Sequence, residues 1–459
     1  MKFLKPVLFI VLFIVLFINL SFGQQIKSFS IDDAILYATK NSPEIINAKL
    51  KVQDAKQQKI ETRAIGLPKL SFSGDYNYFF DIPTQLLPDF ISPSVYGVLA
   101  QEQLINHPPP QGSDRFFEAK FGQNHNLTLG TNLNSILFSG EYLVALKTSK
   151  VYENFSNQQM EATVKSVKDK TKEAYLPALL INENINILDK NIANLNKLKN
   201  EMQQMYKEGF VEQLDVDRLV LSLENLKVER ENIKNQEVIV KNVLKLTMGY
   251  PIEDSLEIVD NIDKILNSID DSKLFSKLNL DKRPDYLTLK KSLELQNLNI
   301  KRYKSQYLPT LVGFGSYSQK MVGNNKDDLK WFPTSLAGLT LKMNIFDGLG
   351  RKAKIQRAKL SLQMAENDLD KFQSVINMQV NNAKLAYTSA NKSLKSREAN
   401  LNLAERIYNT SKIKYKEGIG SSVELTQAEQ SLYQAQANVL KAKYELLVAK
   451  IKLYSALGY

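Results

Sequence analysis

Apolar residues recur at alternating spacings of three and four near the C-terminus of the chain. Large and small side chains alternate in this series, which favours close pairing of helices in a coiled coil. Its members are Leu425, Ala428, Leu432, Ala435, Val439, Ala442, Leu446, Ala449, Leu453 and Ala456. A second series with the same spacing runs from Val216 to Thr247, weakened by Arg230 and Glu237. We therefore expect two paired helices, at about 212–248 and about 421–457.

Each of these helices follows a stretch that is almost free of helix breakers. Residues 141–208 contain no glycine and one proline, Pro177, while residues 351–417 contain neither. The pattern predicts helices at about 140–208 and about 350–417, each roughly 100 Å long. Both stretches end in Tyr-Lys-Glu-Gly, at Gly209 and Gly418. Because a glycine just past a helix is a capping and reversal signal, we expect two large helical hairpins.

Four segments alternate apolar and polar residues, which predicts strands with one apolar and one polar face. They cover about 67–80, 124–139, 309–321 and 335–347, and in the last of them Met343 and Ile345 extend the apolar face. Residues 81–122 are rich in proline, glycine and polar residues and are expected to form a long loop with little regular structure. Residues 251–283 are expected to form short peripheral helices.

The two halves of the chain match at an offset of 209 residues, from the Tyr-Lys-Glu-Gly turns to the final Gly-Tyr pair. Leu67-Pro68 likewise has a counterpart in Leu308-Pro309. A long internal repeat usually means that the fold is built twice. We predict two structural repeats, 24–250 and 284–459, joined by 251–283. Each repeat would contain a helix, two strands, a long helix and a returning helix.

Residues 1–23 have the pattern of a cleaved export signal. Lys2 and Lys5 precede an apolar run at 7–18, and small residues follow at Ser21 and Gly23. The run is shorter than the ~20 residues that a membrane-spanning helix needs. We expect the mature chain to begin at Gln24 and to contain no transmembrane helix.

Charge and reactive residues exclude several classes of function. The net charge is +11, but lysine and arginine are spread among acidic and amide residues, which is typical of solvated helix faces and not of a nucleic-acid site. The chain has no cysteine and two histidines, His107 and His125, which we interpret as loop and strand-end residues. We therefore expect no metal, no cofactor, no catalytic site and no enzyme activity.

The predicted strands are long enough to cross an outer membrane, since a tilted strand needs about 9–11 residues. Lipid cannot satisfy open backbone groups, so such strands must close into a barrel. Four strands are too few, because the smallest single-chain barrels have about eight. Several chains must therefore contribute.

The mature chain resembles the TolC family of outer-membrane efflux proteins over its whole length. The residues that carry the resemblance are Ser30–Ile46, the Leu-Pro pairs at Leu67 and Leu308, Asn344–Ile355 and the two Tyr-Lys-Glu-Gly turns. The resemblance implies a mainly α fold with membrane β: a homotrimer whose 12-stranded barrel, with four strands per chain, continues into a long helical periplasmic tunnel. It also implies export of small molecules when a periplasmic adaptor and an inner-membrane transporter dock at the inner tip.

By position, the resemblance places a periplasmic constriction near the two turns. Its residues would be Tyr206, Asp215, Arg218, Tyr415, Glu424 and Gln427. Symmetry-related carboxylates at a narrow neck repel one another and attract cations. Asp215 and Glu424 have a second interpretation, as charges that stabilise helix N-termini. Gly420 stands where the family has a basic residue, and Gln427 stands where it has a second acid, so we expect a reduced carboxylate ring with at most one Glu per chain from this turn.

Two further groups of residues follow from the same resemblance. Gly209, Gly418, Ser421 and Ser422 are the expected edge for adaptor docking, and helix capping accounts for the glycines in either case. An aromatic girdle at the membrane interface would contain Phe79, Phe80, Trp331 and Phe332, for which packing at strand ends is the alternative.

Two other functions remain open at this point. The same architecture would serve as the exit duct of a type I protein secretion system, because the helices would look alike. In a different class, the chain would be a periplasmic coiled-coil scaffold without a pore. The amphipathic strands argue against the scaffold.

Overall fold

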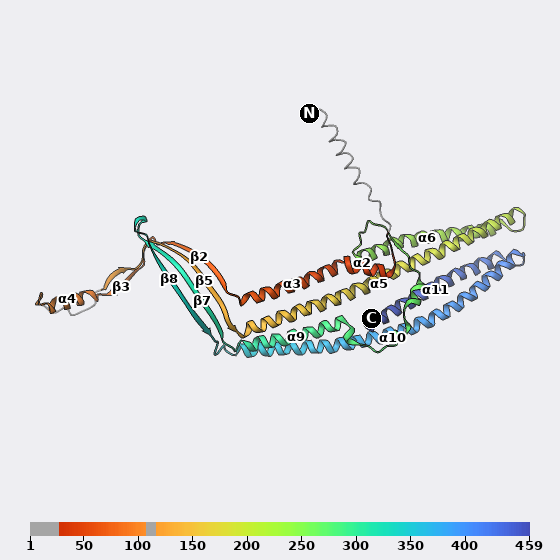
Figure 1. The fold of residues 1–459 in the computed structure, drawn as a ribbon. Helices are drawn as coiled ribbons and strands as arrows, with labels where there is room; N and C mark the ends of the chain where they lie inside the picture. Colours follow the sequence, from red (N-terminus) through yellow and green to blue (C-terminus); the bar gives the residue numbers. More distant parts are fainter. Residues whose placement is uncertain (1–26, 107–115) are drawn as a thin grey trace, which may run out of the picture. The chain divides into compact units, whose positions relative to one another are not determined.

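The computed structural model describes residues 27–106 and 116–459 and divides into two compact units. Among these residues, the helical unit takes 27–57, Lys150–Asn297 and Lys359–Tyr459, and the sheet unit takes 58–106, 116–149 and Leu298–Ala358 (Figure 1). Both units therefore draw on both halves of the chain. The predicted export signal, residues 1–23, and His107 lie outside the described residues.

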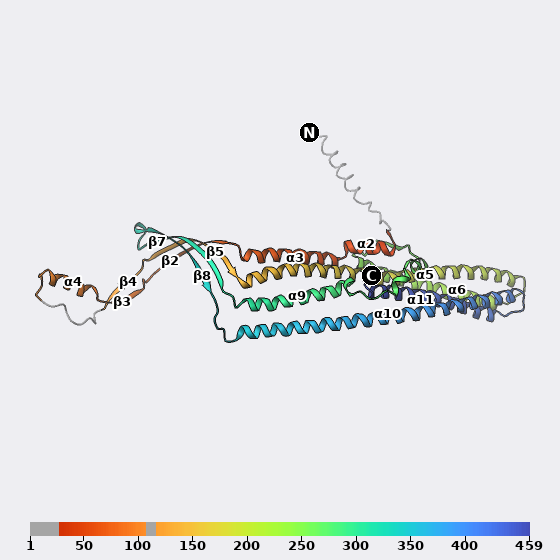
Figure 2. The same ribbon diagram turned by 60° about the horizontal axis from the view of Figure 1, so that its bottom comes forward.

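Four helices form two hairpins in the helical unit. α5 (Gly140–Lys207) is followed by α6 (Gln213–Met248), and α10 (Gly350–Lys416) is followed by α11 (Ser422–Ala456). Each bound lies within one residue of the expected one, and α5 continues through Pro177. Figures 1 and 2 show the two helices of each hairpin lying side by side.

Three shorter helices complete the pattern: α2 (Ile31–Asn41), α3 (Pro43–Ile65) and α9 (Pro284–Ser305). Ser30 and Asp33 form a capping box at the start of α2, as expected from their spacing. Pro43 and Pro284 open their helices, where the N–H that proline lacks is not needed.

The apolar seam predicted for α11 is buried at every position except Ala435 and Ala456. The weaker seam on α6 is interrupted in the way its sequence suggests. Instead of packing in the seam, Arg230 forms an ion pair with Asp189 on α5, at 2.5 Å. Glu237 forms an ion pair with Lys241 on its own helix. Charged residues in the seam thus find partners at its edge.

Residues 251–283 form short elements that pack on the helical core: β6 (Leu256–Ile258), α7 (Ile262–Ser268), α8 (Asp271–Leu274) and η1 (Leu280–Lys282). The short helices were expected. The strand β6 was not, and it pairs in parallel with β1 (Lys27–Phe29). Buried Tyr175 on α5 holds this pair to the helices, since its single O–H is shared between two acceptors, the carbonyl of Phe29 at 3.0 Å and Asp260 at 2.9 Å.

The sheet unit holds a four-stranded antiparallel sheet in the order β2-β5-β7-β8. The strands are β2 (Lys69–Tyr78), β5 (His125–Ser139), β7 (Thr310–Gly323) and β8 (Lys330–Lys342). The register separates two faces. One carries Leu70, Phe72, Tyr76, Leu127, Met321, Trp331, Leu339 and Leu341; the other carries Ser71, Ser73, Asp75, Asn77, Asn126, Asn132, Ser316, Ser318 and Lys320. The expected amphipathic character is therefore present.

The last strand lies earlier than predicted. We expected about 335–347, whereas β8 covers Lys330–Lys342, so Met343 and Ile345 lie beyond it. The reason is pairing: Lys342 faces Thr310, the first residue of β7, which follows a proline that cannot donate a backbone hydrogen bond. Pro333 is tolerated within β8 because this strand is at the edge of the sheet.

The expectation of a long irregular loop at 81–122 was wrong. This segment contains β3 (Thr84–Pro88), α4 (Ile91–Gln101) and β4 (Phe116–Lys120), and β3 pairs with β4 in an antiparallel sheet of their own. Two of the prolines that suggested a loop are compatible with these elements, while Pro108–Pro110 lie outside the described residues. Pro88 ends β3, and Pro93 is in the first turn of α4.

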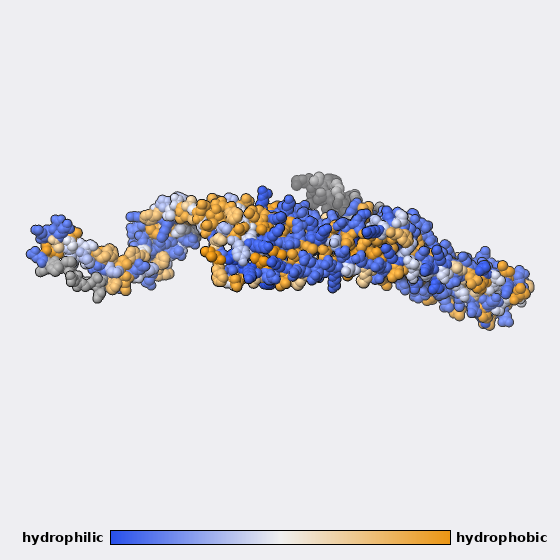
Figure 3. All heavy atoms as spheres, turned by 90° about the horizontal axis from the view of Figure 1, so that it is seen from below, coloured by the Kyte–Doolittle hydropathy of each residue, from blue (hydrophilic) through white to orange (hydrophobic). Residues whose placement is uncertain are grey.

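Hydrophilic atoms cover much of the helices in the space-filling view, with apolar atoms exposed at the hairpin ends (Figure 3). Several apolar side chains of the sheet are also exposed in the single chain, among them Leu70, Phe72, Leu339 and Leu341. Among residues 27–106 and 116–459, we find no helix with the length and apolarity needed to cross a bilayer.

Candidate functional site at the hairpin turns

Both hairpin turns are closed by the same backbone motif. Gly209 and Gly418 adopt φ angles of 79° and 77°, a region that favours glycine. In the first turn the amide of Gly209 donates to the carbonyl of Tyr206 at 3.0 Å, and the amide of Phe210 donates to that of Met205 at 2.9 Å. The second turn repeats both bonds. This is a Schellman closure, so the predicted capping role of both glycines is confirmed.

The returning helices begin with carboxylates in capping positions. At α6 the amide of Glu212 donates to Asp215 at 3.3 Å in a capping box. At α11 the hydroxyl of Ser421 accepts the amide of Glu424 at 3.1 Å. Asp215 and Glu424 thus occupy the third position of their helices, where negative charge also interacts favourably with the helix dipole. The helix-terminal interpretation describes the local geometry of both.

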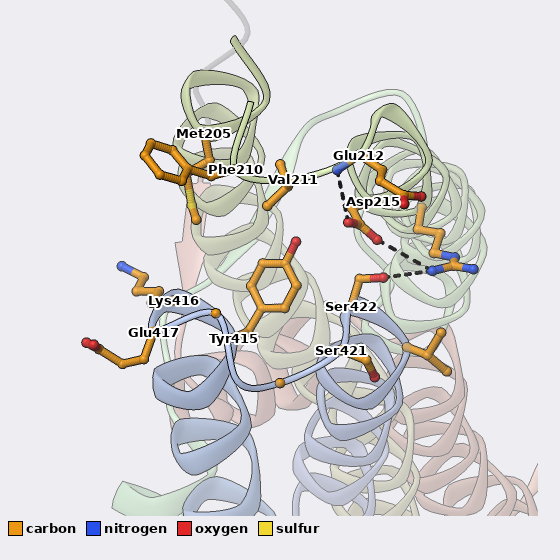
Figure 4. A pocket seen from close by; sticks show the side chains of 14 residues that line it. Met205, Phe210, Val211, Glu212, Asp215, Tyr415, Lys416, Glu417, Ser421 and Ser422 are labelled. Atoms are coloured by element: carbon orange, nitrogen blue, oxygen red, sulfur yellow. Dashed lines mark hydrogen bonds and ion pairs between the residues drawn. The ribbon is translucent and has the colours of Figure 1, made fainter. Parts of the chain in front are cut away.

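Two polar contacts join the first hairpin to the second at this level. Arg218 on α6 donates to the hydroxyl of Ser422 on α11 at 2.7 Å, and it lies 3.6 Å from Asp215 (dashed lines in Figure 4). Lys416 on α10 lies 2.7 Å from Glu201 on α5. Because these partners belong to different hairpins, both contacts must break if the hairpins separate here.

The two tyrosines of the Tyr-Lys-Glu-Gly turns have different environments. Tyr415 is 5% exposed, whereas Tyr206 is 43% exposed. Burial, aided by the nearby negative charge of Asp215, raises the pKa of Tyr415 to about 12. Within the described residues its hydroxyl has no hydrogen-bond partner. Tyr415 therefore stays neutral, and its ring packs between the two hairpins.

A cavity of about 760 Å³ opens between the turns, and Figure 4 shows the labelled side chains around it. Of the predicted constriction residues, Asp215, Arg218 and Tyr415 line it, while Tyr206, Glu424 and Gln427 do not. The lining also includes residues that the sequence did not single out: Met205, Phe210, Val211, Glu212, Lys416, Glu417 and Val423. Gln427 instead lies on a second, polar cavity of about 580 Å³ with Arg397 and Gln430.

The predicted docking residues are mostly engaged in the structure of the turns themselves. Ser421 caps α11, Ser422 is buried against Arg218, and Gly209 and Gly418 cap their helices. The most exposed apolar side chains at the turns were missed: Phe210 is 76% and Ile419 is 79% exposed. These two directly follow the capping glycines at equivalent positions of the repeat. An apolar residue after a helix-capping glycine was the available signal.

The predicted girdle residues lie at one end of the sheet, because Phe79 and Phe80 follow β2 where β8 begins. Trp331 pairs with Met321 on the apolar face, whereas Phe332 pairs with Lys320 on the polar face. His125 is the first residue of β5, and its Nδ1 lies 2.7 Å from the hydroxyl of Tyr76. Its interpretation as a strand-end residue is confirmed.

Metal chemistry finds no support in the part of the chain that the structure describes. There, no group of three or more histidine, aspartate or glutamate residues is arranged to hold an ion.

Comparison with known proteins finds a family model that matches the C-terminal part of the chain. Residues 276–459, less than half of the chain, match the model described as outer membrane efflux protein. AprF, the alkaline protease secretion protein of Pseudomonas aeruginosa, is 23% identical over 177 residues, which are 38% of this chain. The match spans 37% of the length of AprF, about a third of that curated relative.

Solved structures show similarity of fold over nearly the whole chain. CusC, studied for the conformational changes that accompany folding and transmembrane channel formation, has a TM-score of 0.69 at 17% identity, covering 93% of this chain and 91% of CusC. The open state of the MtrE outer membrane channel of Neisseria gonorrhoeae has a TM-score of 0.68 at 17% identity, covering 93% of this chain and 88% of MtrE. The expected fold, mainly helical with a four-stranded sheet in each chain, is confirmed.

Proposed function

We propose that three copies of this chain form an outer-membrane channel that exports small molecules. In this proposal the chain reaches the outer membrane after removal of an export signal, its barrel contacts outer-membrane lipid, and its helical part is periplasmic. A periplasmic adaptor and an inner-membrane transporter are the proposed partners. The observation that carries the proposal is a four-stranded sheet with two free edges and one apolar face.

The free edges require further strands. Within the described residues β2 and β8 each have one neighbour in this sheet, so each leaves a row of backbone groups unpaired. In lipid such groups must be paired, which only a closed barrel achieves. Two copies would supply eight strands, and the interior of a barrel of about eight strands is filled by side chains. Three copies would supply 12 and leave room for a duct.

The hairpin turns are the proposed gate of this duct. Arg218 bonds Ser422 across the hairpins at 2.7 Å and Tyr415 fills the space beside it. Arg218 thus supplies, from the other hairpin, the basic group that Gly420 does not. We assign Asp215 and Glu424 to helix capping and to the charge of the neck, and Tyr206 and Gln427 to its exposed surface.

The exposed apolar residues of the turns are the proposed contact for the adaptor. Phe210 and Ile419 project from Gly209 and Gly418 at equivalent positions of the repeat, so a trimer would present six such residues. Ser421 and Ser422 would support this edge through the start of α11. At the membrane, Phe79, Phe80 and Trp331 form the proposed aromatic girdle, and Phe332 joins it from the polar face.

Release of a secreted polypeptide is the second candidate function. The observation that favours it is the match to AprF, a protein named for secretion of alkaline protease. The gate and the sheet would serve a polypeptide as well as a small solute. A deletion strain separates the two: sensitivity to a panel of toxic compounds indicates solute export, while loss of a protein from the medium indicates secretion.

Channel formation itself is tested with the purified protein. We expect it to fractionate with the outer membrane, to run as a trimer after chemical cross-linking, and to produce single-channel currents in planar bilayers. A soluble periplasmic protein without channel activity would refute the proposal and favour the scaffold.

A further inference from the structure

A line of polar residues on α11 recurs every seven residues beside the apolar seam: Ser422, Glu429, Gln436, Lys443 and Lys450. In a coiled coil such a line occupies one edge of the seam, where side chains reach neighbouring elements. Ser422, Glu429 and Lys450 are buried. The corresponding positions of α6 are Gln213, Val220, Lys227, Lys234 and Lys241, so the first repeat has a similar line in which Val220 stands in place of the acid.

Two members of this line bond to the first repeat, and two bond to the joining segment 251–283. Ser422 accepts from Arg218 on α6 at 2.7 Å, and Gln436 accepts from Asn191 on α5 at 2.9 Å. Lys443 lies 2.7 Å from Asp263 on α7, and Lys450 lies 2.7 Å from Asp271 on α8. The polar line therefore joins α11 along its length to the first hairpin and to the short helices of 251–283.

Glu429 is the exception in this line. It is 1% exposed, and its Oε1 accepts the hydroxyl of Tyr433 on the same helix at 2.6 Å. Its Oε2 is buried and has no hydrogen-bond partner in residues 27–106 and 116–459. Since the side chain is already buried in the single chain, a neighbouring copy cannot reach it. A buried carboxylate with an unpaired oxygen is costly when charged.

We propose that Glu429 is a proton-operated release point of the gate, which keeps the second hairpin packed on the first when protonated and loosens it when ionised. The inference rests on the proposed gating function and adds its regulation. Glu429 lies one heptad, about 10 Å, from Ser422, the partner of Arg218, so ionisation of Glu429 acts two helical turns from the contact that joins the hairpins.

The groups around Glu429 determine the direction of the response. Burial raises the pKa of Glu429, while the hydrogen bond from Tyr433 and the positive charge of Lys412 on α10 oppose this rise. Tyr408 on α10 also faces it, and Glu201 on α5 lies beyond Tyr408. These neighbours do not supply an ion pair, because no side-chain nitrogen lies within salt-bridge distance of Glu429 in the described part of the chain.

Because the packed state binds this proton more tightly than the separated, solvated state, protonation stabilises packing. That contribution is fully present below the ordinary glutamate pKa of 4.5 and is lost as pH rises through the higher pKa of the packed state. Each unit of difference between the two pKa values changes the ratio of packed to separated gates by up to about tenfold. The gate should therefore open more readily as pH rises.

Distance measurements test this without relying on channel current. The chain has no cysteine, so Glu208→Cys and Glu417→Cys place spin labels at equivalent exposed positions of the two turns. In trimers assembled with excess unlabelled chain, we expect longer label distances to gain population as pH rises from about 4 to 8, by several-fold. In Glu429→Gln, which cannot ionise, the distribution should stay at the short, packed distances.

Glu445→Gln, an exposed acid on the same helix, is the matched control and should keep the wild-type response. If Glu429→Gln impairs assembly, Glu429→Leu provides a second uncharged variant. A pH response that persists in both variants, or a wild type without one, would overturn the inference. Channel currents are recorded in parallel: a pH-dependent distance without any current would refute the proposed channel and leave the proton-operated contact standing.

Discussion

Replacing Ser422 by alanine should release the proposed gate, since it removes the acceptor of Arg218 at 2.7 Å and little else. Ser422 is buried at the first position of α11, and the cap of that helix is the neighbouring Ser421. The helix start is therefore left intact. Arg218 keeps its contact with Asp215 at 3.6 Å, so no charge is left isolated.

The magnitude follows from the exposure of the donor. A hydrogen bond to a charged group contributes about 1.5–3 kcal/mol when buried. The side chain of Arg218 is 37% exposed, so solvent screening reduces this to about 1 kcal/mol per chain. That shifts the gate equilibrium about fivefold if protomers move independently. If three protomers open together, the lost free energy adds up to about 3 kcal/mol and the gate equilibrium shifts roughly 150-fold.

The assay is the open probability of single channels at neutral pH. Ser422→Ala and Arg218→Met should each raise it, and the double variant should add little, because both remove the same bond. Gln213→Ala is the matched control at the equivalent position of the first repeat, where the side chain bonds only to Asp217 on its own helix at 2.7 Å. An unchanged open probability in both single variants, or fully additive effects in the double variant, would refute a role for this contact in closure.

Three further predictions concern assembly and stability. Leu339→Arg should abolish outer-membrane assembly, because a charge on the lipid face of a barrel costs about 2–4 kcal/mol near the midplane. Thr340→Arg, on the other face of the sheet, should still assemble. The reverse result would mean that the face of Thr340, and not that of Leu339, contacts lipid. Gly249→Ala should lower the melting temperature more than Gly209→Ala. Both glycines have positive φ, but a Cβ added at Gly249 would lie 2.6 Å from the carbonyl oxygen of Asn41, whereas a Cβ added at Gly209 would meet nothing within 4 Å. Tyr175→Phe should cost about 1–3 kcal/mol of unfolding free energy, since the two acceptors lose the hydroxyl that they share. Tyr152→Phe, at an exposed tyrosine, is its control. Equal denaturation midpoints for Tyr175→Phe and the wild type would contradict the role of the Tyr175 hydroxyl.

The helix ends were predictable because their signals are local. Gly209, Gly418 and Ser421 act within one turn of the residues they cap, through bonds that span five residues or fewer. The seam of α11 was predictable for a related reason, since helical periodicity brings residues three and four apart to one face. The error at 81–122 came from the same reliance on local signals, because Pro88 and Pro93 mark a strand end and a first helical turn as well as a loop.

The strands show where local signals end. Alternation predicted the amphipathic faces of β2, β5 and β7, but the limits of β8 depend on Thr310, its partner in β7. The pairing of β1 with β6 joins three-residue segments more than two hundred residues apart, and nothing in either segment specifies the other. Partner strands determine register, because backbone bonds in a sheet are formed between segments.

For the gate, the sequence by itself determined the two turns, their capping glycines, and the carboxylates that begin the returning helices. Only the tertiary structure decided that Arg218 bonds Ser422, that Tyr415 is buried while Tyr206 is exposed, and that Glu429 lacks a partner among the described residues. The physical reason is that capping acts within one turn of helix, whereas burial and ion pairing depend on which faces of distant helices meet.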